Sequence, residues 1–247
     1  MRVLIKHFVM LLLLIGAFGS EVLATESSSG AAQRPRIGLV LSGGGARGAA
    51  HVGVIRVLEE NRIPIDLITG TSMGSIVGGL YASGMSVDEI DHTIRTIDWD
   101  DALQDKSERR LKPYRRKKDD EDFLFEAAPG YRDGEVVFPT GLIIGQKINL
   151  ILKELTLPVA MVSNFDDLAI PFRAVATNIV DGGRVVLGKG DLAKAMRASL
   201  GVPGVFAPLE HQGMLLVDGG VSDNLPVEAA RDMGADVVIV VDISTPL

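Results

Sequence analysis

In the first part of the folded region, apolar runs of strand length alternate with segments whose apolar residues recur at helical spacing. Residues 36–42 and 65–69 are mainly apolar stretches of strand length. Each is followed by apolar positions at helical spacing, over 49–61 and 73–83. Buried strands that alternate with helices are typical of a parallel sheet covered by helices. The pattern therefore predicts an α/β fold.

Hairpins join the alternating pattern toward the C-terminus. Asp181-Gly182-Gly183 and Gln212-Gly213 have the composition of hairpin turns. Ser86 and Glu89 have the spacing of a capping box at the start of a helix. Further helices are predicted at 86–96, 145–157, 192–199 and 226–233, and strands at 172–178, 185–187, 214–217 and 236–243. The strand at 236–243 is apolar enough to predict burial on both faces.

The N-terminus has the pattern of a secretory signal peptide over residues 1–24. Arg2 and Lys6 precede an uncharged apolar run, and small residues up to Ala24 offer a cleavage site. The alternative is a retained membrane anchor, but a bilayer needs about 20 apolar residues and this run, 8–19, is shorter. We therefore expect export to the periplasm, the cell surface or the medium.

Composition divides the rest of the chain into a linker and one domain. Residues 25–35 are small and polar and predict a flexible linker. The chain as a whole has 47% hydrophobic residues, and the region 36–247 is long enough to form a single domain around one core. A charge-rich segment at about 98–135 is expected to be an irregular insertion in this domain.

Charge and residue usage exclude several classes of function. The formal net charge of −7 makes nucleic acid an unfavourable partner. The chain has no cysteine, which excludes thiol and zinc-thiolate chemistry. Its histidines have no metal-ligand spacing: His7, His51, His92 and His211. We therefore predict no metal and no cofactor.

Gly70-Thr71-Ser72-Met73-Gly74 lies where the second predicted strand meets its helix. A sharp strand-to-helix turn exposes a serine hydroxyl at the edge of a sheet, and flanking glycines allow the backbone to pass closely. The helix N-terminus favours developing negative charge. Ser72 is therefore a candidate nucleophile, supported by Gly70 and Gly74.

A second glycine-rich turn follows the first predicted strand. Because residues without side chains let a carbonyl oxygen approach the main chain, the amides of Gly43, Gly44 and Gly45 are candidate oxyanion donors. Gly48 belongs to the same motif. Arg47 either pairs with a carboxylate that fixes the loop or holds the loop amides toward substrate, and we favour a supporting structural role.

Asp218 is the best candidate for the base that activates the serine. It directly follows a predicted strand and precedes Gly219 and Gly220, which places it at the same sheet edge as Ser72. No histidine has this placement. A serine–aspartate dyad can work if burial raises the pKa of the carboxyl. The alternative is a turn aspartate that bonds its own backbone.

These three motifs, in this order and separation, resemble those of the patatin-like phospholipase family. The resemblance spans about residues 36–242. It implies a three-layer α/β/α fold with a mostly parallel sheet, with Ser72 as nucleophile, Asp218 as base and Gly43–Gly45 as oxyanion hole. It also implies a lipid acyl hydrolase of phospholipase A or lysophospholipase type, without cofactor, acting on lipid esters at a membrane surface.

Two further segments are similar to one branch of that family. Residues 116–120 and 169–177 resemble exported bacterial members of the patatin-like protein D type, which are autotransporter passengers. Two alternatives stay open: a non-catalytic secreted lipid-binding module of the same fold, and a dinucleotide-binding domain. The latter would use Gly43, Gly45 and Gly48 as its fingerprint, with Asp66 as the acidic residue.

Overall fold

The computed structural model describes residues 34–103, 105, 113–115, 130–132, 135–137 and 143–244. The residues from Pro35 onward form one compact unit. The predicted signal peptide lies outside the described residues, as does the predicted linker apart from its last two positions. None of the helices described combines the length and the apolar character that crossing a bilayer would require.

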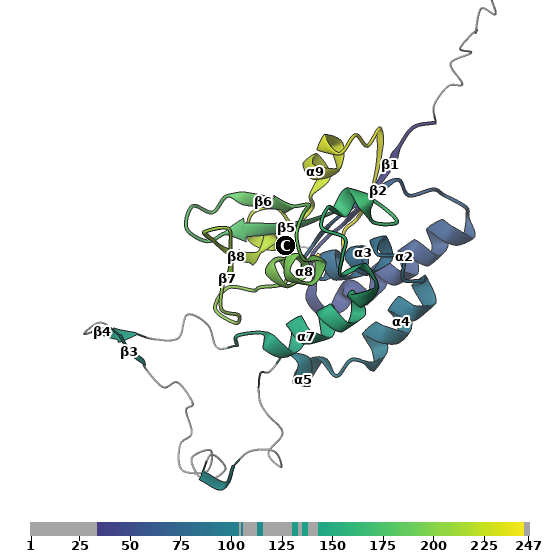
Figure 1. Ribbon diagram of the computed structural model, residues 1–247. Helices are drawn as coiled ribbons and strands as arrows, with labels where there is room; N and C mark the ends of the chain where they lie inside the picture. The colour runs from purple at the N-terminus through teal and green to yellow at the C-terminus, as the bar shows by residue number, and fades with distance from the viewer. Residues whose placement is uncertain are drawn as a thin grey trace, which may run out of the picture. The chain divides into compact units, whose positions relative to one another are not determined.

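A mixed sheet forms the centre of the domain (Figure 1). Its strands are β1 Ile37–Leu41, β2 Leu67–Thr71, β5 Phe172–Asn178, β6 Arg184–Leu187, β7 Leu209–His211, β8 Met214–Asp218 and β9 Val237–Val241. The order is β7-β8-β5-β2-β1-β9, with β6 also paired to β5. Strands β9, β1, β2 and β5 are parallel, whereas β6, β7 and β8 are antiparallel.

Strand β5 brings the ends of β2 and β8 together. Strands β2 and β6 both pair with positions 174 and 175, so they lie on opposite edges of β5. Strand β8 shares positions 176 and 177 with β6, and therefore lies on the same edge as β2. Because β8 runs antiparallel to β5, its last residue meets the end of β2.

Helices cover both faces of the sheet, as the three-layer prediction required. The face with the larger hydrophobic core is covered by α2 Ala49–Glu60, α3 Met73–Ala82, α4 Val87–Thr96, α7 Gln146–Leu155 and α8 Leu192–Ser199. On the other face lies α9 Val227–Asp232. Along β1, Leu39 and Leu41 pack into the larger core and Val40 into the smaller one, because successive side chains of a strand point to opposite faces.

Side-chain caps fix the starts of two predicted helices. Ser86 and Glu89 form both bonds of the capping box at α4. Asp191 accepts the amide of Lys194 at the start of α8. Short 3-10 helices complete the fold: η2 Gly45–Gly48, η4 Leu157–Val159, η5 Phe165–Asp167 and η6 Gly219–Val221.

The last strand is less buried than its sequence predicted. Strand β9 is at the edge of the sheet and pairs with β1. Val237 and Val240 are 45% and 43% exposed, so the prediction of a strand buried on both faces was wrong. An apolar run indicates a strand but does not distinguish a central strand from an edge strand.

The charge-rich segment begins with ordered structure. Helix α5, Trp99–Ala102, is capped by Asp98, and Ala102 is buried. Strands β3 Gly130–Arg132 and β4 Glu135–Val137 pair in a separate two-stranded sheet. Most of the remaining segment lies outside the described residues, including nearly all of residues 109–118, where its basic side chains gather.

Candidate active site

Ser72 occupies a strained turn between β2 and α3. Its φ of 53° and ψ of −122° are unusual for a residue with a side chain. Such conformations cost about 1–3 kcal/mol and persist where the surroundings hold them. A Cβ at position 70 would lie 2.5 Å from the Gly74 carbonyl oxygen, and one at position 74 would lie 2.4 Å from the Leu41 carbonyl oxygen. The close backbone passage predicted for both glycines is therefore present.

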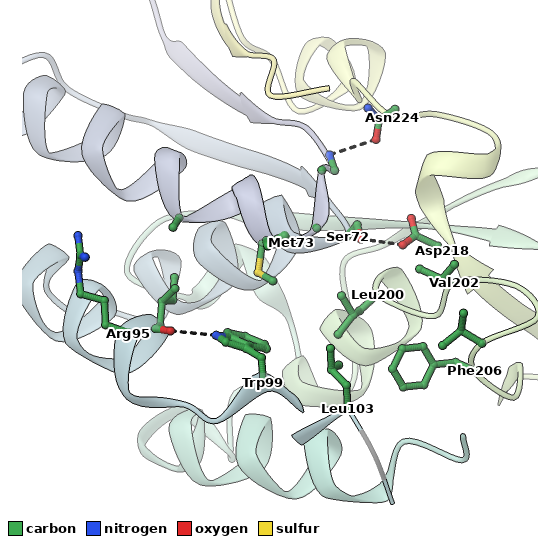
Figure 2. Close-up of a pocket in the computed structure, with 17 residues that line it drawn as sticks. Ser72, Met73, Arg95, Trp99, Leu103, Leu200, Val202, Phe206, Asp218 and Asn224 are labelled. Atoms are coloured by element: carbon green, nitrogen blue, oxygen red, sulfur yellow. Dashed lines mark hydrogen bonds between the residues drawn. The ribbon is translucent and has the colours of Figure 1, made fainter. Parts of the chain in front are cut away.

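The hydroxyl of Ser72 donates a hydrogen bond to Asp218. Ser72 Oγ lies 2.6 Å from Asp218 Oδ2, and the two residues are 6% and 7% exposed. Figure 2 shows the pair at the edge of a pocket. The distance suits proton transfer between a nucleophile and its base. The structure thus brings together two residues that are far apart in the sequence.

The other carboxylate oxygen of Asp218 fixes the turn that carries it. Asp218 Oδ1 accepts the amide of Gly220 at 2.7 Å, as the turn-aspartate alternative proposed. The geometry therefore leaves room for both predicted roles, one on each oxygen. Burial raises the pKa of Asp218 above its ordinary value of 3.8, while the hydrogen bonds from Ser72 and Gly220 partly oppose that shift. A carboxylate with a raised pKa is a stronger base.

The predicted oxyanion loop lines the same pocket as the serine. Gly43, Gly44 and Gly45 all face the pocket. The amide of Gly43 already donates to Asn224 Oδ1 at 3.1 Å, which makes this amide a fixed part of the loop. Gly45 has a φ of 57°, and no atom lies within 4 Å of a Cβ placed there. Gly44 and Gly45 therefore remain the candidates for contact with a ligand.

Two further motif glycines lie where the chain packs too closely for a side chain. A Cβ on Gly48 would lie 1.8 Å from Met73 Cγ, so only glycine lets η2 pack on the start of α3. A Cβ on Gly219 would lie 2.2 Å from the Val175 carbonyl oxygen. Arg47 is exposed on η2, and its supporting role stays a prediction.

His51 is fully buried in α2, where Nε2 lies 2.8 Å from the Ser42 carbonyl oxygen and donates to it. Burial lowers the pKa of His51 and keeps the ring neutral. Among the described residues that line the pocket there is no histidine. Within the described part of the chain, no cluster of three His, Asp or Glu residues could hold a metal ion.

Two polar residues at the site were missed by sequence reasoning. Asn224 holds the glycine loop, and Ser199 Oγ accepts the amide of Ser72 at 2.8 Å. Ser199 is the last residue of α8 and lies in the buried end of that helix. Asn224 follows the Asp-Gly-Gly turn. Polar residues at these places were the available signal, but their partners are distant in the sequence.

The pocket beside Ser72 is mainly apolar and has a volume of about 620 Å³. Its walls come from helices α4 and α5 and from the loop 200–206 (Figure 2). The apolar lining residues include Met73, Ile94, Trp99, Leu103, Leu200, Val202, Val205 and Phe206. Trp99 is held by a hydrogen bond from Nε1 to the Ile94 carbonyl oxygen at 2.9 Å. A pocket of this size and character suits a hydrocarbon chain.

A nucleophile elbow with a carboxylate partner, on an α/β fold and beside an apolar pocket, defines the class of serine hydrolases that act on esters. The match to the family model of patatin-like phospholipases covers residues 39–231. The chain belongs to the patatin-like phospholipase family.

Curated relatives agree with this family. An uncharacterized NTE family protein of Mycobacterium bovis is 37% identical over 85% of this chain and 49% of its own. Lysophospholipase NTE1 of Mycosarcoma maydis is 36% identical over 85% of this chain and 10% of its own. The chain thus spans about half of the mycobacterial relative and a small part of the fungal one.

Among solved structures, VipD of Legionella pneumophila aligns with a TM-score of 0.52 over 83% of this chain and 49% of its own. Its 18% identity shows the shared fold. Membership of the exported autotransporter branch stays a prediction.

Proposed function

We propose that this protein is a lipid acyl hydrolase that forms an acyl-enzyme at Ser72. The observation that carries the proposal is the 2.6 Å hydrogen bond between Ser72 and Asp218, two buried residues beside an apolar pocket. The substrate class is a phospholipid, lysophospholipid or other lipid ester, because the walls fit an acyl chain and the family contains phospholipases.

In the first half of the reaction, Asp218 takes the proton of Ser72 as Oγ attacks the ester carbonyl carbon. The amides of Gly44 and Gly45 donate to the developing oxyanion, and the dipole at the start of the following helix adds to this stabilisation. The tetrahedral intermediate collapses, the ester C–O bond breaks, and the alcohol leaves with the proton held by Asp218. The acyl group remains on Ser72.

In the second half, water attacks the acyl-enzyme while Asp218 takes its proton. The fatty acid leaves, and the proton returns to Ser72. Gly43 differs from its predicted role in this scheme, because Asn224 occupies its amide. We propose that Gly43 orients the loop while Gly44 and Gly45 contact the oxyanion.

Covalent labelling tests the nucleophile directly. A fluorophosphonate probe should label the wild-type protein at Ser72, and Ser72→Ala should abolish both labelling and ester hydrolysis. Labelling that persists at another residue of Ser72→Ala would overturn the assignment. Mass spectrometry of products from defined phospholipids would then identify the acyl position and the headgroup.

Exchange of His51, His92 and His211 for Gln tests the absence of a histidine base. A folded triple variant should keep its activity. Because His51 is buried and bonded to Ser42, its replacement should lower the free energy of unfolding. A folded triple variant without activity would require a histidine in the mechanism.

We propose that the substrate is met at a membrane surface. Val202 and Val205 line the pocket and are also 43% and 40% exposed, so these two apolar side chains are available to contact a membrane. Ser substitutions at both positions should weaken sedimentation with phosphatidylcholine vesicles while hydrolysis of a soluble short-chain ester continues. Equal vesicle binding by wild type and variant would contradict this role.

Export by the N-terminal segment remains a proposal that rests on its sequence pattern. N-terminal sequencing of the protein from cell fractions should find a mature chain that begins at Thr25, outside the cytoplasm. A chain that keeps residues 1–24 in the soluble cytoplasmic fraction would contradict export.

Two other functions fit less of the geometry. A non-catalytic lipid-binding module would use the pocket but would leave the buried Ser72–Asp218 pair without a role. A dinucleotide-binding domain would use the first glycine turn alone and would leave both other motifs unexplained. Calorimetry with NAD and an esterase assay distinguish both from the hydrolase.

A further inference from the structure

The hydrogen-bond ladder between β2 and β5 is interrupted at the nucleophile. The amide of Ile68 donates to the Pro171 carbonyl at 2.9 Å, and the register then advances two residues on each strand for each bond. The same repeat would place the amide of Ser72 on the carbonyl of Val175. In the structure this amide donates instead to Ser199 Oγ at 2.8 Å.

The hydroxyl of Ser199 restores the interrupted connection. Ser199 Oγ accepts from the Ser72 amide and donates to the Val175 carbonyl oxygen at 2.5 Å. One hydroxyl is thus inserted between the two groups that a continuous ladder would join. Ser199 is fully buried in this position. The insertion lets the Ser72 backbone leave the sheet while its amide keeps a partner.

The Val175 carbonyl also contacts the turn that carries the base. Gly219 passes so close that a Cβ there would lie 2.2 Å from the Val175 oxygen. In addition, Ala176, the next residue of β5, pairs with Asp218. Ser199 therefore ties the nucleophile to the strand position that also fixes the base.

We propose that Ser199 is a positioning residue that holds Ser72 in its strained conformation with its hydroxyl aimed at Asp218. The expected effect on the reaction rate rests on the proposed function. The claim that Ser199 holds the Ser72 turn does not depend on that function. Loss of the Ser199 hydroxyl leaves the Ser72 amide without its partner and lets the turn relax. A small displacement of a nucleophile can slow a reaction by as much as about a hundredfold.

Two substitutions test this role against one matched control. Ser199→Ala removes the hydroxyl, and Ser199→Cys fills the space with a weak hydrogen-bonding group. The control is Thr69→Val on β2, because Thr69 also donates a buried hydroxyl bond to a carbonyl, that of Pro226 at 3.0 Å, without contacting Ser72. The control measures the effect of losing a buried hydroxyl bond elsewhere in the domain, on strand β2.

Both Ser199 variants should lower the rate of fluorophosphonate labelling and kcat at least tenfold, with KM changed less than about twofold. Hydrogen exchange of the Ser72 amide, followed by NMR, should become at least tenfold faster in both. Thr69→Val should slow neither labelling nor turnover and should not speed exchange of the Ser72 amide, except to the extent that the variant is less stable. Labelling and Ser72 exchange at the wild-type level, or equal effects in the control, would overturn the proposal.

The two measurements separate this inference from the proposed function. If the wild-type protein is not labelled and hydrolyses no ester, the proposed function fails. Exchange of the Ser72 amide still decides whether Ser199 holds the turn, because it needs no substrate.

Discussion

Asp218 makes two different contacts through its two carboxylate oxygens. One oxygen holds the Asp-Gly-Gly turn, and the other accepts the hydroxyl of Ser72. Burial raises the pKa of this carboxyl and makes its ionised form costly in the folded state. The residue that we propose as the base is therefore expected to reduce the stability of the fold at neutral pH.

Asp218→Asn tests both consequences. It should lower kcat by about 10²–10⁴-fold, the usual contribution of a general base. It should also raise the Tm at pH 7, because the amide removes a buried charge.

The pH dependence of stability follows from the raised pKa. Between the ordinary value of 3.8 and the raised folded value, native Asp218 binds a proton that the unfolded chain has released, so the contribution of this group to stability falls as the pH rises. The Tm advantage of Asp218→Asn should therefore shrink as the medium is acidified. Hydrolysis by the wild type should decline as the pH falls through the same raised pKa. A lower Tm for the variant at pH 7 would contradict the account.

Asn224 offers a second prediction for a single residue. Asn224→Ala should lower kcat about tenfold with little change in KM, because the Gly43 amide loses its partner and the loop loses its orientation; complete loss of an oxyanion donor costs about 10²–10³-fold. Steady-state kinetics with a soluble ester give both constants. Asn61→Ala is the control, since Asn61 is exposed at the end of α2 and bonds Val57. Equal kcat in the wild type and Asn224→Ala would exclude the role.

The strand–turn–helix element around Ser72 depends on a close approach of two backbones. At Gly74, the start of α3 passes the end of β1 so closely that no side chain fits. The same chain contains Gly53, which lies in the interior of α2, and a Cβ placed there would meet nothing within 4 Å. These two helical glycines therefore have opposite consequences when they are replaced.

Gly53→Ala should raise the free energy of unfolding by about 0.8–1 kcal/mol, because alanine is the better helix former. Gly74→Ala should lower it by roughly 1–3 kcal/mol or more, since the new methyl group collides with the Leu41 carbonyl. Urea unfolding of the two variants measures both values. Similar effects of the two substitutions would show that helix propensity, and not close packing, governs position 74.

The pocket is a property of the whole molecule. Ser72 and the glycine loop line one part of the pocket, and α4, α5 and the loop 200–206 line the rest (Figure 2). Arg95 lines the same pocket and is paired with Asp91 at 2.9 Å, with most of its side chain exposed. The chemical groups are thus supplied by one sheet edge and the apolar walls by other segments.

Trp99→Leu should therefore affect long substrates more than short ones. Loss of part of the indole surface should raise KM for a long-chain ester several-fold, since each buried CH₂ contributes about 0.8 kcal/mol. Hydrolysis of an acetate ester should change little. Val57→Ala, an exposed position on α2, serves as the control. Equal changes for both esters would show that Trp99 does not contact the acyl chain.

The sequence by itself determined the alternation of strands and helices, the elbow at Ser72 and the motifs on the glycine loop and Asp218, because periodicity and turn chemistry are local. It also placed Ser72 and Asp218 at one sheet edge. Only the tertiary structure decided that β8 meets β2 end to end along β5, and that Asn224 occupies the Gly43 amide. The bridging hydroxyl of Ser199 and the exposed edge of β9 were likewise decided there. These features depend on contacts between residues far apart in the chain, which no local pattern specifies.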